Sequence, residues 1–77
     1  MNNRKRAALR QAIEHLNKAC CIVSSITDQE RDALDNMPEN LQGGTRYEQI
    51  EKAIDHLENA SENIDDAIED IESACIT

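Results

Sequence analysis

The side chains best suited to chemistry are three cysteines, two histidines and 16 carboxylates, in a chain of 77 residues. A cysteine nucleophile needs a basic partner, yet His15 lies more than one helical turn from Cys20 along the same predicted helix. A zinc site needs paired cysteines or histidines at short spacing, and neither His15 nor His56 has such a partner. Catalytic carboxylates need a pocket that shifts their pKa, whereas these are spread along a predicted helix surface. The sequence therefore predicts no enzyme, no metal and no cofactor.

Composition favours an all-α protein of the cytoplasm. Tyr47 is the only aromatic residue, and the chain has two glycines and one proline. Sheets need β-branched and aromatic side chains and frequent turns, so an all-β fold is nearly excluded. No apolar run reaches the ~20 residues of a membrane helix, and no signal-peptide pattern follows the basic start. The cysteines are then expected to be reduced, with Cys20 and Cys75 acting as small core residues.

Breaker residues divide the chain into two long segments. Pro38 ends the first segment, because the residue before a proline is driven out of the helical region. Gly43 and Gly44 follow, and Thr45 with Glu48 has the spacing of a capping box, in which each side chain bonds the other's backbone N–H. We therefore predict one domain over residues 1–77, with helices at about 3–36 and about 45–74 and a loop at 37–44.

Both segments repeat apolar or small residues at alternating spacings of three and four, which is typical of a helix that packs along one seam. The first seam comprises Leu9, Ile13, Leu16, Cys20, Val23, Thr27, Glu30, Leu34 and Met37. The second comprises Tyr47, Ile50, Ile54, Leu57, Ser61, Ile64, Ile68, Ile71 and Cys75. Thr27 and Glu30 interrupt the first seam, and their spacing also fits a capping box. We favour an uninterrupted helix, with a restart at Thr27 as the alternative.

The two seams match in antiparallel register, so the predicted fold is a helical hairpin. Leu34 then faces Ile50, Leu16 faces Ile68, and Leu9 faces Cys75. A second stripe beside each seam makes the apolar surface wider than two helices cover, and a chain this short needs further support. We therefore expect a homodimer that forms a four-helix bundle. Its expected interface consists of Ala19, Cys21, Ile22, Ile26, Ala53, Ala60 and Ala67. The seam residues Glu30 and Ser61 either set the register of the bundle or face solvent.

Charge is concentrated in the second half of the chain. Residues 46–77 carry ten acidic and two basic side chains, whereas residues 1–45 carry six of each, for a net charge of −8. Such a chain is unsuited to binding nucleic-acid phosphates, but it suits a protein with a basic surface. The candidate partner-binding residues are Glu58, Glu62, Asp65, Asp66, Glu69 and Asp70. The alternative is that these carboxylates only keep a small bundle soluble.

The segment 35–60 reads DNMPENLQGGTRYE and, after one residue, IEKAIDHLENA. It resembles a family of short helical-hairpin proteins of Gram-positive bacteria, phages and prophages, which share a DN-x-PENLQ loop followed by an acidic helix. The resemblance implies a helical hairpin and a phage or prophage setting, and it implies no catalytic residues. The start of the chain, Asn2 to Arg10, has no counterpart in this resemblance.

Two classes of function follow from these surfaces. In the first, the protein binds and inhibits another protein, and for a mobile-element product the target is a host defence protein such as a CRISPR effector. In the second, it is a self-associating structural or assembly module, or a small antitoxin-like regulator. The apolar Leu41 either closes the end of the core against Met37 and Tyr47 or forms a partner-binding tip.

Overall fold

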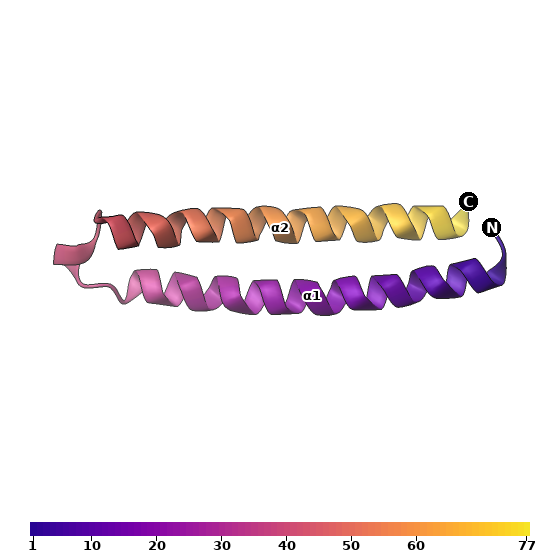
Figure 1. Cartoon of the computed structure of the whole chain (residues 1–77), viewed down its shortest axis with the longest axis horizontal. Helices are drawn as coiled ribbons and strands as arrows, with labels where there is room; N and C mark the ends of the chain where they lie inside the picture. Colours follow the sequence, from indigo (N-terminus) through magenta and orange to yellow (C-terminus); the bar gives the residue numbers. More distant parts are fainter.

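The computed structural model describes all residues 1–77 and consists of two long antiparallel helices joined at one end (Figure 1). Helix α1 spans Asn3–Asp35, the short 3-10 helix η1 spans Glu39–Leu41, and helix α2 spans Thr45–Ile76. The molecule measures 60 × 15 × 13 Å, and both termini lie at the end opposite the loop. The predicted all-α antiparallel hairpin is thus confirmed. Neither helix has a stretch long and apolar enough to cross a membrane.

Helix α1 begins at a side-chain cap and continues without a break through Thr27. The Asn2 side chain accepts a hydrogen bond of 2.8 Å from the backbone N–H of Lys5, which satisfies one of the free N–H groups of the first turn. The Thr27 hydroxyl donates to the carbonyl oxygen of Val23 at 2.7 Å, one turn back. It therefore does not cap a new helix at Glu30, and the prediction of an uninterrupted helix is confirmed.

Helix α2 does not begin with the predicted capping box. Gly44 is the N-cap residue, no side chain caps this end, and Thr45 is already the first helical residue. The two glycines explain the difference. Gly43 has a φ of +82°, which favours glycine, and a Cβ at Gly44 would lie 3.2 Å from the carbonyl oxygen of Leu41. The chain turns through both glycines, so Thr45 enters the helix instead of capping it.

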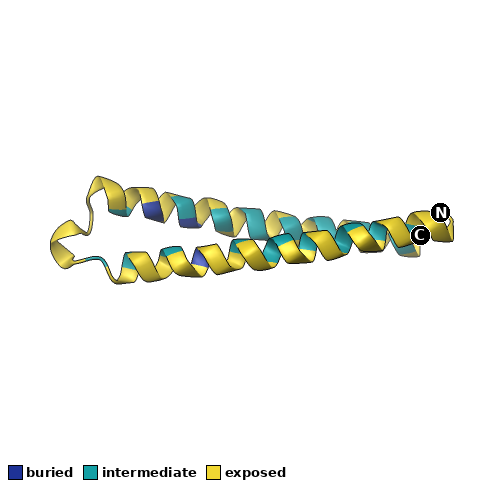
Figure 2. Ribbon diagram, turned by 60° about the horizontal axis from the view of Figure 1, so that its bottom comes forward, coloured by how far each residue is buried: buried dark blue, intermediate teal, exposed yellow.

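The buried strip of the hairpin coincides with the predicted seams (Figure 2). Every seam residue of both segments is buried or half-buried, Thr27 and Glu30 included. The other residues that are not exposed are Arg6, Ala12, Ala19, Ala53, Ala60 and Ala67. Burial is shallow: only Thr27, Ile50 and Ile54 are buried, at 4%, 8% and 7% exposure. Two helices therefore share one narrow core, and most of the surface of each remains in solvent.

Two of the three side-chain bonds between the helices agree with the predicted register to within one helical turn, and the long Arg31 side chain reaches five residues beyond it to Glu58. The Cys20 thiol donates to the Asp65 carboxylate, next to its predicted neighbour Ile64. At the open end, the Arg6 guanidinium donates to the carbonyl oxygen of Cys75 at 2.9 Å, which satisfies a carbonyl in the last turn of α2. The basic start of α1 is in this way held against the end of α2.

Candidate protein-binding surfaces

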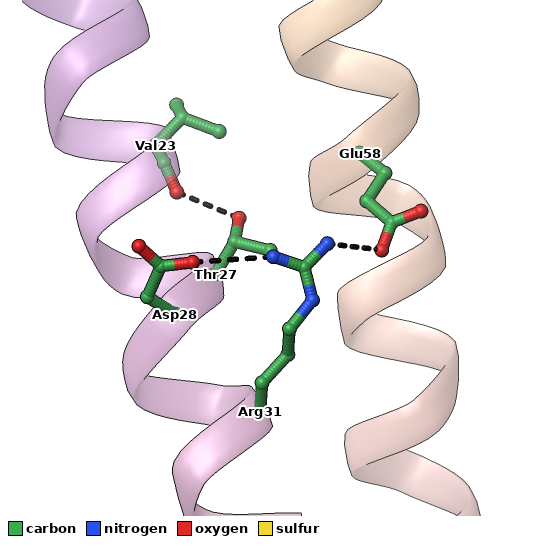
Figure 3. Close-up of polar contacts among 5 residues, drawn as sticks. All are labelled: Val23, Thr27, Asp28, Arg31 and Glu58. Atoms are coloured by element: carbon green, nitrogen blue, oxygen red, sulfur yellow. Dashed lines mark hydrogen bonds and ion pairs between the residues drawn. The ribbon is translucent and has the colours of Figure 1, made fainter.

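Arg31 links the two helices near the middle of the hairpin (Figure 3). Its guanidinium donates to Glu58 of α2 at 2.6 Å and to Asp28 of its own helix at 3.1 Å. The hydrogen bond to Glu58 is the main cause of a raised pKa of the Arg31 guanidinium. Arg31 and Glu58 are about half exposed and Asp28 is more so, and ion pairs this accessible to water contribute little to stability.

A polar cleft lies beside this ion pair. It has a volume of about 340 Å³, and no hydrophobic residue lines it. Its walls are Ser24, Thr27, Asp28, Arg31, Glu58, Ser61 and Glu62. Thr27 and Ser61 are the small polar residues of the two seams, and the cleft opens where they replace larger apolar side chains. The middle of the hairpin is therefore polar on this side.

The six predicted partner-binding residues are all exposed on α2. We call them the acidic ribbon: Glu58, Glu62, Asp65, Asp66, Glu69 and Asp70. Four of them directly follow a seam residue, so they project about 100° from the seam, in one row. Asp66 and Asp70 lie further round the helix. The structure therefore brings four of the six carboxylates together along one flank, and one of these four, Glu58, is engaged by Arg31.

Cys20 contacts the acidic ribbon through its thiol. Its Sγ lies 3.7 Å from Oδ1 of Asp65 and donates to it. Partial burial, reinforced by the negative charge of Asp65, raises the pKa of the Cys20 thiol. A thiol in this state is protonated at neutral pH and is a poor nucleophile. All three cysteines are free, and no three His, Cys, Asp or Glu side chains gather to hold a metal ion.

The opposite flank carries small and apolar side chains. Each directly precedes a seam residue, so it projects about 100° from the seam in the other direction. Arg31 and Glu58 each directly follow a seam residue, and their bond shows that the residues following the two seams lie on the same broad face of the hairpin. The residues preceding the two seams therefore lie together on the other broad face. We call this second surface the small-residue face: Ala12, Ala19, Ile22, Ile26 and Ala33 of α1 with Ala53, Ala60, Ala67 and Ala74 of α2.

Six of the seven predicted interface residues lie on the small-residue face, and Cys21 does not. Cys21 follows the seam residue Cys20, which places it about 140° around α1 from Ile26. One docked helix cannot cover both. Ile22 and Ile26 are exposed, at 65% and 41%, and are the large apolar side chains of this face.

The loop presents Leu41 to solvent. Leu41 is 54% exposed, so it does not close the end of the core, whereas Met37 and Tyr47 are half-buried. Backbone N–H groups of Leu41 and Gln42 donate to Pro38 and Glu39, and the Gln42 side chain donates to the Met37 carbonyl oxygen. These hydrogen bonds support the backbone of the tip, and the apolar Leu41 side chain stays exposed on it.

Arg31 is the residue that the sequence interpretation overlooked. It follows Asp28 by three residues, a spacing that pairs side chains on one helix. The pair with Asp28 was therefore readable from the sequence. The pair with Glu58 was not, because the predicted register places Arg31 opposite Ala53, five residues from Glu58.

No family model, curated protein or solved structure matches the chain.

Proposed function

We propose that the chain is a non-enzymatic protein-binding module that presents its acidic ribbon to a basic surface of another protein. The class of target that suits it best is a host defence protein of the CRISPR-effector type, whose basic groove normally receives nucleic acid. The protein would then act in the cytoplasm of a bacterial host cell and belong to a phage or other mobile element. The phage setting rests on the family resemblance of the loop and the acidic helix.

The observation that carries the proposal is the density of free carboxylates on a rigid support. Five of the six residues of the acidic ribbon make no ion pair, and all six are exposed within about three and a half turns of α2. A fixed row of negative charge raises the association rate with a basic surface and loses influence as salt is added. Glu58 contributes less free charge, because Arg31 already neutralises it.

The test is capture of a target by charge-neutralised protein. Asp65, Asp66, Glu69 and Asp70 are changed to Asn or Gln, and binding is compared with the unchanged protein at low and moderate salt. We expect at least tenfold weaker capture at low salt and a shallower dependence on salt. Helicity is checked by circular dichroism, since these exposed side chains do not support the core.

A matched control removes the same number of charges elsewhere. Glu39, Glu48, Glu51 and Asp55 are changed to the corresponding amides, which gives the same net charge outside the acidic ribbon. The control should bind nearly as well as the unchanged protein. Equal loss in both variants would show that only net charge matters, and no loss in either would refute binding through the acidic ribbon.

A second candidate function is a self-associating structural or assembly module. It is favoured by the small-residue face, where Ile22 and Ile26 lie exposed with no partner in the hairpin. Self-association is compatible with target binding, because the four residues of the acidic ribbon that directly follow the seam, Glu58, Glu62, Asp65 and Glu69, lie on the opposite broad face. An antitoxin-like role remains the weakest proposal, since the basic residues near the N-terminus lack aromatic neighbours and a helix-turn-helix pattern.

A further inference from the structure

The hairpin exposes more surface than a globular chain of its size. Its accessible surface is 5836 Å², whereas a monomeric protein of 8.7 kDa exposes about 4,700 Å². The excess is about 1,100 Å², and a stable interface buries about 800 Å² on each partner. The surface in excess is thus sufficient for one interface of standard size.

The small-residue face is the surface best suited to be covered. Its alanines allow another helix to approach closely, and its two exposed isoleucines supply the apolar area. The broad face that carries the acidic ribbon, in contrast, is lined with carboxylates and with the polar cleft. Burying that face would remove charges from water without partners, which is costly.

We propose that a second copy of this chain docks on the small-residue face, with the two loops at the same end of the resulting four-helix bundle. The inference rests on the self-association proposed above and adds the face and the orientation. The two-fold axis then runs along the long axis of the molecule, and each α1 lies on the partner's α2.

Charge determines the orientation. Helix α1 carries six basic and five acidic side chains, whereas α2 carries two basic and ten acidic ones. With the loops at opposite ends, α2 would lie directly on the partner's α2, and the two most acidic helices would be neighbours. With the loops at the same end, α1 separates them, and the two α2 helices occupy the diagonal of the bundle. Since repulsion weakens with distance and with screening, the second arrangement is favoured.

The spacing of the small residues supports the same arrangement. Both helices repeat the stripe every seven residues, and Ile26 of α1 lies at the level of Ala60 of α2. A two-fold axis along the molecule keeps these levels aligned, so Ile26 meets the space left by an alanine of the partner. Large and small side chains then alternate across the interface, as a close-packed core requires. In both copies, Glu58, Glu62, Asp65 and Glu69 of the acidic ribbon remain on the outer face of the bundle.

The first test measures mass by sedimentation equilibrium. The mass measured for the unchanged protein should be twice the single-chain mass of 8.7 kDa. Changing Ile22 and Ile26 together to Glu should weaken association at least tenfold. The matched control changes Cys21 and Ser25 to Glu. It introduces the same two charges one residue earlier in α1, at positions that lie outside the small-residue face. The control should remain dimeric. A single-chain mass for the unchanged protein, or equal association of the two variants, would overturn the proposal.

The second test does not depend on the stability of any interface variant. Asn40 is changed to Cys in a chain whose three native cysteines are Ser, and a nitroxide label is attached. With helix axes 8–10 Å apart, two loop labels at the same end lie within about 30 Å. Labels at opposite ends would lie near 60 Å, the length of the hairpin. The longer distance, or no dipolar coupling, would overturn the proposed orientation.

These outcomes are independent of the charge test of target binding. A monomer that still loses its target when the acidic ribbon is neutralised would overturn the docked second copy and retain the proposed function. A dimer whose target binding does not depend on the acidic ribbon would do the reverse.

Discussion

Replacing Thr27 by valine should leave the stability of the hairpin nearly unchanged, although Thr27 is its most buried residue. The threonine hydroxyl bonds only the Val23 carbonyl oxygen, which in an α-helix also accepts the backbone N–H of residue 27. Loss of the hydroxyl therefore leaves no acceptor unsatisfied. The two residues have similar helix propensity, so the helix itself is little affected.

The magnitude follows from two opposing contributions. The lost hydrogen bond costs about 0.5–1.5 kcal/mol, a net figure that already includes the cost of burying the hydroxyl. The added methyl group, buried in the seam, contributes about 0.8 kcal/mol. The two nearly cancel, so the free energy of unfolding should change by less than about 1 kcal/mol, and Tm should shift by less than about 4–8 °C for a chain of this size.

The assay is thermal and urea unfolding followed by circular dichroism at a fixed protein concentration. Thr27→Ser is the matched control, because it keeps the hydroxyl and removes the methyl group. It should lower the free energy of unfolding by about 1 kcal/mol. A valine variant less stable than the unchanged protein by about 2 kcal/mol or more would refute the reasoning, because it would show that the hydroxyl bond outweighs the apolar contact.

Three further predictions concern the core, the turn and a thiol. Ile54→Ala should lower the free energy of unfolding by about 2–4 kcal/mol, whereas Ile76→Ala, at an exposed position, should have little effect in the same urea titration. Gly43→Ala should cost about 1–2 kcal/mol, because φ is +82° there; an unchanged Tm would contradict the left-handed conformation. The third prediction uses a variant in which Cys20 is the only cysteine. At about pH 8, iodoacetamide should label this thiol more slowly in the folded protein than in the urea-unfolded protein, because the raised pKa in the folded state leaves less reactive thiolate. Asp65→Asn should speed this labelling, and an unchanged rate would exclude Asp65 as a cause of the raised pKa.

The seams were predictable because a helix with one apolar neighbour leaves a simple period in the sequence. Each seam residue is buried or half-buried, even Thr27 and Glu30, whose polarity interrupts the apolar pattern. Position in the register decided their burial, since a continuous helix cannot turn one residue away from its partner. The preference of threonine for a cap was overridden by its bond to the Val23 carbonyl oxygen.

The start of α2 and the loop were less predictable because they depend on backbone conformation. Thr45 and Glu48 fit a capping box by spacing alone, but the turn through Gly43 and Gly44 places Thr45 inside the helix. Leu41 was expected either to close the core or to form an exposed tip. Its exposure depends on a 3-10 turn that residue types alone do not specify.

The candidate surfaces were predictable as flanks of the seams but not in their pairings. The flank that precedes each seam is small and apolar, and the flank that follows it on α2 is acidic. Which acidic residue is already neutralised depends on the long Arg31 side chain, whose reach across the helices the periodic pattern does not encode.

The most direct test of the central claim is carboxyl footprinting of the free protein and of its complex with a captured target. Exposed carboxylates are labelled with a carbodiimide and glycine ethyl ester, and labelling is measured for each residue by mass spectrometry. We expect strong protection in the complex at Glu62, Asp65, Asp66, Glu69 and Asp70, with Glu48, Glu51 and Asp55 labelled as in the free protein. If each residue of the acidic ribbon were labelled to the same extent in the complex as in the free protein, that result would contradict the claim that the acidic ribbon binds the target.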